Sequence, residues 1–176
     1  MNDVKSKKKT GPFTPISKDG KLLPEVLELI DFIAKHPQLV LATGHSSAAE
    51  DVLVVHEAHQ RGVTHIIVTH PSVPYIHMTI PQMQEAARDG AFLEFTYLGA
   101  LDDPQNAFKE YANAIRQVGP EHCILDTDLG LVDPPHPLHP QGLLEFMQTL
   151  HKEGISVDDL NLMTKTNPAH ILGLQP

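Results

Sequence analysis

The sequence predicts an α/β fold built from parallel strand–helix repeats. Short apolar runs alternate with longer amphipathic segments along most of the chain, and the short runs are mostly apolar on both faces. Such strands are typical of a parallel sheet that helices cover on both sides, and the intervening helices give each crossover the length that parallel pairing needs. Right-handed crossovers then leave two architectures, an open doubly wound sheet or part of a closed barrel.

The expected elements follow one another along the chain. A first helix begins near Leu23, with Pro24 in its first turn, and ends at residues 36–37. Four units of strand and helix come next. The expected strands are Leu39–Thr43, His65–Thr69, Ala91–Tyr97 and His122–Thr127.

Capping residues mark the helices that follow these strands. Ser47 with Glu50, and Thr79 with Gln82, match the capping-box pattern of a helix start. The third of these helices starts at Asp103 and closes at residues 119–120. After a long loop over residues 128–140 comes an amphipathic helix, and a last helix starts at residue 156 and is expected to end at residues 167–168, where proline follows asparagine.

Length and composition favour one globular domain. The chain has 176 residues, 41% of them hydrophobic, so we expect a lysine-rich disordered tail over residues 1–15 and a single domain over residues 16–176. No apolar stretch approaches the roughly 20 residues of a membrane span. The single cysteine, Cys123, cannot form an internal disulfide and fits a reducing compartment. We therefore expect a cytoplasmic protein with no membrane partner.

The net charge of −9 argues against nucleic acid as a partner, because binding to a phosphate backbone depends on lysine and arginine. The twelve histidines are the more informative feature, since histidine is the commonest metal ligand. We therefore expect a small-molecule substrate, and the positions of the histidines narrow the chemistry.

Histidines and carboxylates lie where the strands end. In parallel α/β folds the functional site lies at the carboxyl ends of the strands. His45 follows the first strand, His70 follows the second, and Asp128 follows the fourth, while Glu94 lies on the third and Asp126 ends the fourth. Imidazole and carboxylate groups together suit a divalent metal ion. His45, His70 and Asp128 are therefore the predicted metal ligands, with zinc as first candidate and manganese, iron or nickel as alternatives.

A metal at this position indicates hydrolytic chemistry. A bound divalent ion lowers the pKa of its water to about 7, and a neighbouring carboxylate can take the proton and pass it to the leaving group. Asp128 is the predicted catalytic carboxylate, with Asp126 as the alternative. His77 lies in the loop after the second strand, at the same end of the sheet, and is a candidate for contact with the substrate.

The strand-end motifs resemble those of a known superfamily. Thr43-Gly44-His45, Thr69-His70-Pro71 and Thr127-Asp128-Leu129-Gly130 look like strands five, six and eight of the amidohydrolase superfamily of metal-dependent hydrolases. The stretch Asp19–Val26 and the run Asn167–Gly173 strengthen the resemblance, which is closest to an uncharacterised family of unknown function. The resemblance implies the C-terminal half of a (β/α)8 TIM barrel.

The same resemblance implies an activity and roles for residues. Water activated by the metal would attack a small amide, ester or lactone. His45 and His70 would hold the ion, Asp128 would be a ligand or the catalytic acid and base, and Glu94 would support the ligands or face the substrate.

The chain departs from the superfamily pattern before Leu39. The His-x-His pair of strand one is missing, and there is no room for four further strands. Either the chain is a truncated product or another chain supplies the other half, and open sheet edges favour self-association or pairing with an N-terminal half. The alternative function is an inactive barrel fragment or binding domain. A third, a metal-dependent nuclease, fits the acidic composition poorly.

Overall fold

The computed structural model describes residues 15–130 and 137–174. Four strands form a parallel sheet in the order β3-β4-β5-β6, the same order as in the chain. Their bounds are β3 (Leu41–Ala42), β4 (Ile66–Val68), β5 (Ala91–Thr96) and β6 (Cys123–Asp126). The predicted α/β class with parallel strand–helix repeats is confirmed. The expected tail lies almost entirely outside the described residues.

Seven α-helices accompany the sheet in the described residues, and the predicted helix starts are close to the observed ones. They are α1 (Pro24–Ala34), α2 (Ala48–Gln60), α3 (Ile80–Arg88), α4 (Pro104–Val118), α5 (His139–Lys152), α6 (Val157–Asn161) and α7 (Asn167–Ile171). Ser47 with Glu50 and Thr79 with Gln82 form the two expected capping boxes. These caps place the starts of α2 and α3 directly after the loops that carry the candidate site.

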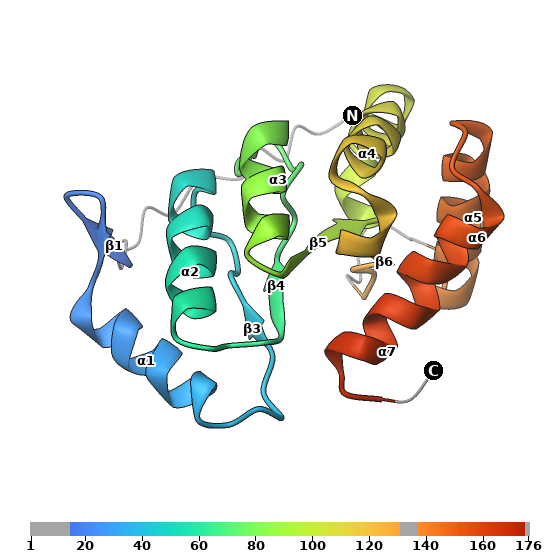
Figure 1. The fold of residues 1–176 in the computed structure, drawn as a ribbon. Helices are drawn as coiled ribbons and strands as arrows, with labels where there is room; N and C mark the ends of the chain where they lie inside the picture. Colours follow the sequence, from blue (N-terminus) through green and yellow to red (C-terminus); the bar gives the residue numbers. More distant parts are fainter. Residues whose placement is uncertain (1–14, 131–136, 175–176) are drawn as a thin grey trace.

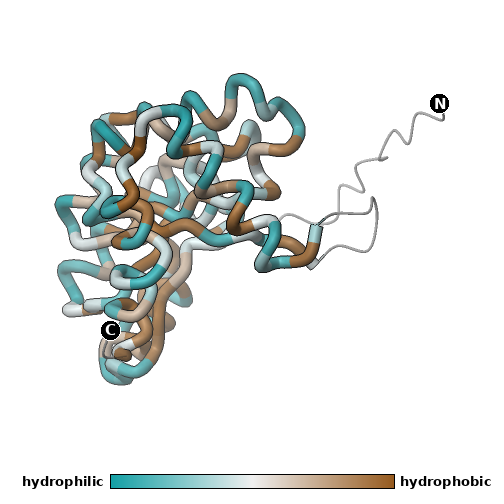
Figure 2. The backbone as a smooth tube through the Cα atoms, turned by 90° about the vertical axis from the view of Figure 1, so that its right-hand side faces the viewer, coloured by the Kyte–Doolittle hydropathy of each residue, from teal (hydrophilic) through white to brown (hydrophobic). Residues whose placement is uncertain are grey.

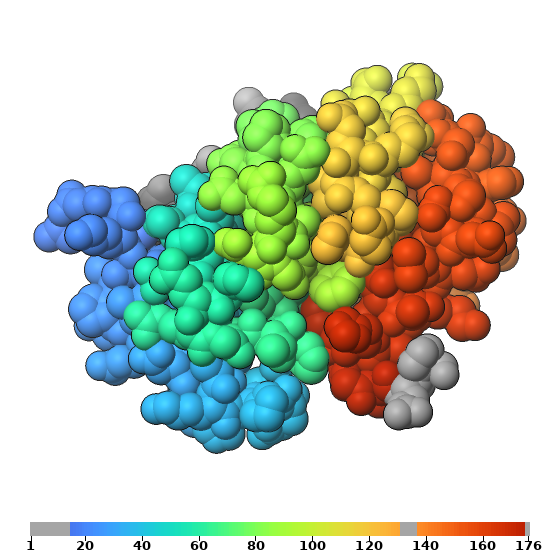
Figure 3. All heavy atoms as spheres, viewed as in Figure 1, coloured from blue at the N-terminus to red at the C-terminus, as the bar shows by residue number. Residues whose placement is uncertain are grey.

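The helices α2, α3 and α4 lie on one side of the sheet (Figure 1) and form a closely packed layer there (Figure 3). Consecutive crossovers of the same hand, joining strands in chain order, put their helices on the same side. The strand residues that face this layer are buried, among them Val68, Leu93 and Leu125. The sheet is therefore firmly anchored on this side.

The other side of the sheet is only partly covered. Ala42 is exposed, and Ile67 and Phe92, its neighbours in register along the same face, remain partly exposed. In the view turned by 90°, the helical layer lies to one side of the strands (Figure 2). The expectation of helices on both sides is thus met on one side only, because all three crossovers between the strands return along that side.

The C-terminal helical segment continues past the point where we expected it to end. A wide π-helical turn, Leu162–Thr166, links α6 to α7, and Pro168 lies in the first turn of α7. A proline is tolerated there because the first N–H groups of a helix have no partner within it. Asn167 donates from Nδ2 to the carbonyls of Pro120 (2.9 Å) and Cys123 (2.7 Å), which attaches α7 to the start of β6.

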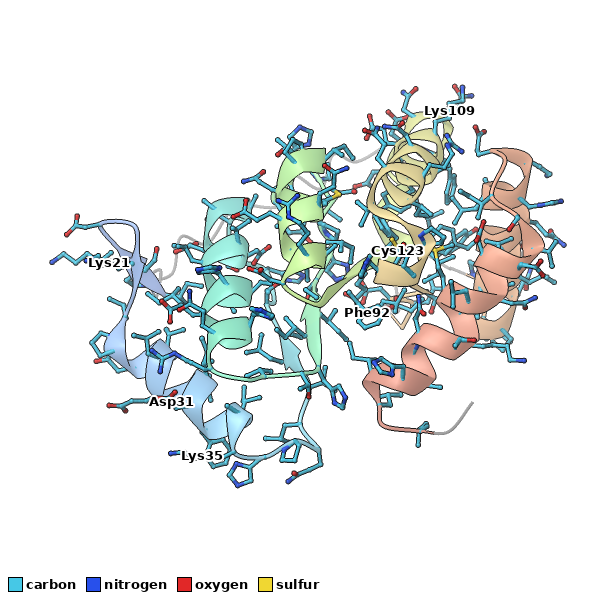
Figure 4. All side chains as sticks on the ribbon, viewed as in Figure 1. Lys21, Asp31, Lys35, Phe92, Lys109 and Cys123 are labelled. Carbon is cyan, nitrogen blue, oxygen red and sulfur yellow. The ribbon has the colours of Figure 1, made fainter. Side chains whose placement is uncertain are left out.

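Two further features lie outside the expected pattern. A small hairpin, β1 (Ser17–Lys18) and β2 (Lys21–Leu22), turns through Asp19 and Gly20, which both have positive φ angles, as an Asp-Gly hairpin turn requires. At the amino end of the sheet, Phe92 lies beside α7 (Figure 4), and the centroid of its ring is 6.1 Å from that of His170.

No helix in the described ranges is long and apolar enough to cross a membrane.

Candidate active site

His45 and His70 meet at the carboxyl edge of the sheet. Their ring centroids are 5.2 Å apart and their planes are inclined by 25°. The backbone turns sharply before each ring, with φ of 69° at Gly44 and 50° at His70 itself. A left-handed conformation at a non-glycine residue costs roughly 1 to 3 kcal/mol and is frequent at functional sites. The structure thus brings the two predicted histidines together.

Two threonines hold these histidine loops against each other. The backbone N–H of Thr69 donates to Thr43 Oγ1 at 3.2 Å, and the N–H of Gly44 donates to Thr69 Oγ1 at 3.3 Å. These bonds join the two segments beyond the last paired residues of β3 and β4. The positions of His45 and His70 are therefore fixed by the sheet as well as by their own loops.

Asp128 faces His70 from the loop after β6. Its Oδ2 lies 3.7 Å from His70 Nε2, and its side chain is 51% exposed. The other ring nitrogen, Nδ1, lies 3.4 Å from Thr96 Oγ1 and 3.8 Å from Glu94 Oε2. Burial lowers the pKa of His70, although Asp128 partly opposes the effect. A neutral imidazole is thereby favoured, and this is the form that binds metal ions.

A pair of carboxyl groups lies behind His70. Glu94 comes from β5 and Asp126 from the neighbouring strand β6. Burial, with the nearby charge of Asp126 as the next cause, raises the pKa of Glu94 to about 8. Burial likewise raises the pKa of Asp126. Two neighbouring carboxylates cannot both ionise cheaply, so the raised pKa values favour a proton shared by the pair near neutral pH.

Asp51 is a residue of the site region that our sequence analysis missed. It lies in the first turn of α2, is fully buried, and accepts a hydrogen bond from Ser46 Oγ. Among the described residues its Oδ2 has no hydrogen-bond partner, and burial raises the pKa of Asp51 to about 6. The signal was present, because Asp51 begins the buried helix face that continues through Val54, Val55 and Ala58.

A cavity of about 300 Å³ opens beside His70 and Asp128. The end of β5 and the loops after β4 and β5 supply its other walls, including Thr96, Tyr75 and Asp102. The ring of Tyr75 also stands edge-on to that of His45, at a centroid distance of 5.5 Å. The cavity has room for a small organic substrate next to the predicted ligands.

The remaining histidine candidates lie around this cluster. His77 is exposed, with φ of 48°, and lines an adjoining cavity rather than the one beside His70. His139, the first residue of α5, lies with Nδ1 2.9 Å from Thr127 Oγ1, directly before Asp128 in the chain. His139 therefore lies close to the loop that carries Asp128.

Two of the predicted donor atoms have nearly the spacing that a metal ion needs. Two ligands of a tetrahedral zinc ion are separated by about 3.4 Å, since each bond is about 2.1 Å long. The 3.7 Å between His70 Nε2 and Asp128 Oδ2 is close to this value. Within residues 15–130 and 137–174, however, no three histidine, cysteine or acidic side chains are already arranged to hold an ion. The donor types of His45, His70 and Asp128 fit a transition metal.

The described residues define an α/β protein with a histidine–carboxylate cluster at the carboxyl edge of a parallel sheet. Residues 2–94, just over half of the 176-residue chain, match the model of a family of unknown function, DUF6282, and the chain belongs to this family. The matched part includes His45, His70 and Glu94. No curated protein and no solved structure shows a significant match to the chain.

Proposed function

We propose that the chain carries part of the active site of a metal-dependent hydrolase of the amidohydrolase type. The observation that carries the proposal is the position of His70, stacked on His45 and facing Asp128 across 3.7 Å. His45, His70 and Asp128 would hold the ion, with zinc as first choice and manganese, iron or nickel as alternatives. The substrate class is a small amide, ester or lactone, in keeping with the cavity of about 300 Å³.

The chain's own residues account for proton movement in this proposal. A bound divalent ion would lower the pKa of its water molecule to about 7. Asp128, half exposed at the cavity, would accept a proton from such a water and return it to the leaving group. A proton shared by Glu94 and Asp126 behind His70 would limit the negative charge around the cluster, and Glu94 Oε2 faces Nδ1 of His70 at 3.8 Å.

We propose in addition that the sheet is one half of a (β/α)8 barrel. The strands follow chain order, their helices share one side, and the opposite side keeps Ile67 and Phe92 partly exposed. In such barrels that inner side is filled by side chains from all eight strands. Glu94 on the same face would then point into the barrel, toward the site.

Apolar surface at both edges of the sheet supports the proposal that a second polypeptide supplies the other strands. Apolar residues line a cavity of about 460 Å³ beside β3, including Ile30, Ile33 and Val40, and one of about 540 Å³ beside β6, including Ile124 and Leu143. Exposed strand edges next to apolar surface promote association. A second copy of this chain, or a separate N-terminal half, would cover both.

This arrangement predicts that the purified chain is not a monomer. We expect light scattering coupled to size-exclusion chromatography to give a mass of at least twice the 19.4 kDa of one chain. Replacing Leu143 by Asp, a partly exposed position in the lining of the cavity beside β6, should reduce that mass, because a charge buried in an interface is strongly unfavourable. A compact, well-behaved species of 19.4 kDa would contradict the proposed half-barrel.

Metal content tests the function itself. Elemental mass spectrometry of dialysed protein is expected to find about one transition-metal ion per chain, because two imidazoles and a carboxylate retain such ions. The variant His45→Ala/His70→Ala should lose the ion. The matched control, His56→Ala/His59→Ala, removes two exposed histidines of α2 and should keep it.

The two possible outcomes point to different functions. Metal retained by the control and lost by the site variant would support the hydrolase. If no metal binds, even after reconstitution with zinc and manganese, the better description is a domain that keeps the scaffold without the chemistry.

A further inference from the structure

Asp51 is a buried carboxylate that takes no part in the proton movement proposed above. It lies in the first turn of α2 and is fully buried, although aspartate is rarely buried without partners. Its Oδ1 accepts a hydrogen bond from Ser46 Oγ, while Oδ2 has no hydrogen-bond partner among the residues that the structure describes. A buried carboxyl oxygen without a partner destabilises a folded protein, so packing alone gives no reason for an aspartate at this position.

The hydrogen bond that Asp51 accepts comes from the residue next to His45. Burial raises the pKa of Asp51 to about 6, and the hydroxyls of Ser46 and Thr43 and the ring of His45 act in the opposite direction. The carboxyl group therefore lies close to the whole loop that joins β3 to α2. Asp51 begins the buried face of α2, which continues into the hydrophobic core, so the Ser46 hydroxyl is attached to a well-packed helix.

Two hydrogen bonds flank His45, one on each side in the chain. On one side the N–H of Gly44 donates to Thr69 Oγ1 at 3.3 Å, which attaches the loop to the segment after β4. On the other side Ser46 donates to Asp51, which attaches the loop to α2. His45 itself is exposed, so its position depends on these attachments more than on burial of its own ring. Loss of the bond to Asp51 would weaken the attachment on the α2 side.

We propose that Asp51 is a positioning residue for His45 and acts through the hydroxyl of Ser46. This role rests on the proposed function, in which His45 is a metal ligand. Groups that orient a metal ligand from outside the coordination shell typically change metal affinity by about 10- to 100-fold when they are removed. Asp51 acts through a neighbouring residue, so the lower end of this range is expected. A local conflict with stability, here the unpaired Oδ2, is typical of residues retained for a functional site.

Zinc affinity, measured by competition with a chelating dye, tests this role without requiring any turnover. We expect Asp51→Ala to weaken zinc binding about tenfold. Ser46→Ala should have the same effect, since it removes the same hydrogen bond from the other side. The variant with both changes should bind no more weakly than either single variant, because one bond can be lost only once. Asp51→Asn keeps an acceptor oxygen for Ser46 and should bind zinc with close to wild-type affinity.

A second serine–aspartate pair at the start of α6 provides a matched control. Ser156 Oγ donates to Asp159 Oδ2 at 2.7 Å, on a helix that carries no predicted ligand. Asp159→Ala should lower the urea concentration at the midpoint of unfolding and leave zinc affinity unchanged. If Asp51 were only structural, Asp51→Ala would behave in the same way, with stability lost and zinc affinity kept. Should Asp51→Ala fail to fold, Ser46→Ala tests the same bond at a partly exposed position.

Backbone relaxation in the metal-free protein separates the role of Asp51 from the proposed function. NMR order parameters of about 0.85 mark a rigid backbone, and values below about 0.6 mark a flexible one. We expect the His45 amide to be rigid in the wild-type protein and in Asp51→Asn, and to lose order in Asp51→Ala and Ser46→Ala. If the wild-type protein binds no zinc but these changes occur, the hydrolase is refuted while the positioning of His45 by Asp51 stands.

Three results would overturn the role of Asp51 even in a protein that binds zinc. The first is an unchanged order parameter at His45 in both alanine variants. The second is an additive loss of zinc affinity in Ser46→Ala/Asp51→Ala, which would mean that the two residues act independently. The third is an equal loss in Asp51→Asn and Asp51→Ala, since the hydrogen bond from Ser46 would then not be the cause.

Discussion

Replacing Asp128 by Asn is expected to reduce turnover by a factor of about 10² to 10⁴, for whichever ester, amide or lactone the wild-type protein hydrolyses. This is the usual contribution of a general acid–base group. Asparagine keeps the shape of the side chain but cannot accept a proton. It also tolerates the left-handed backbone conformation at this position, where φ is 47°. The Asp128 side chain is 51% exposed, so the fold should be unaffected. The measurement is turnover of a panel of activated esters, amides and lactones by the metal-loaded protein in its associated form.

Two comparisons make this prediction specific. Asp158→Asn changes an exposed carboxylate in the first turn of α6 and should leave turnover at the wild-type value. Metal content is measured in parallel, since Asp128 is also a proposed ligand. If Asp128→Asn keeps full activity while Asp126→Asn loses it, the proton-transfer role belongs to Asp126 instead.

The parts of the fold that the sequence predicted depend on local interactions. The capping box at α2, for example, needs only Ser47 and Glu50, and Glu50 N donates to Ser47 Oγ at 3.3 Å. The predicted end of the last helix was wrong. A proline breaks a helix only where its missing N–H would have had a hydrogen-bond partner, and the π-helical turn before Pro168 removes that conflict. The Asp19-Gly20 hairpin could have been predicted from its turn residues.

The candidate site was predictable to the extent that it follows from parallel strands. Because β3 and β4 are adjacent and parallel, the loops that carry His45 and His70 start side by side. The pairing of Glu94 with Asp126 depends on the register of β5 and β6, which sequence patterns do not specify. The adjoining cavity that His77 lines depends on how α4 packs beyond the strand ends. These features needed three-dimensional positions.

Replacing Glu94 by Gln is expected to stabilise the metal-free protein at alkaline pH. The folded-state pKa of Glu94 is raised to about 8 from its ordinary value of 4.5, with burial as the main cause. Between these two values the folded state binds more protons than the unfolded state, so wild-type stability falls as pH rises through this window. Since one pH unit corresponds to about 1.4 kcal/mol, the window of about 3.5 units sets an upper bound of about 5 kcal/mol on what the variant gains above it, and the gain below it should be small.

Urea unfolding followed by circular dichroism, near about pH 5 and about pH 9, measures this difference. The amide of Gln can still donate a hydrogen bond to Asp126, so the change removes an ionisation rather than a contact. Glu28→Gln, at an exposed position of α1, is the control and should leave the pH dependence unchanged. An equal effect of Glu94→Gln at both pH values would mean that the carboxyl ionises normally. The shared proton proposed behind His70 would then be absent, and orientation of His70 would rest on Thr96, whose Oγ1 lies 3.4 Å from its Nδ1.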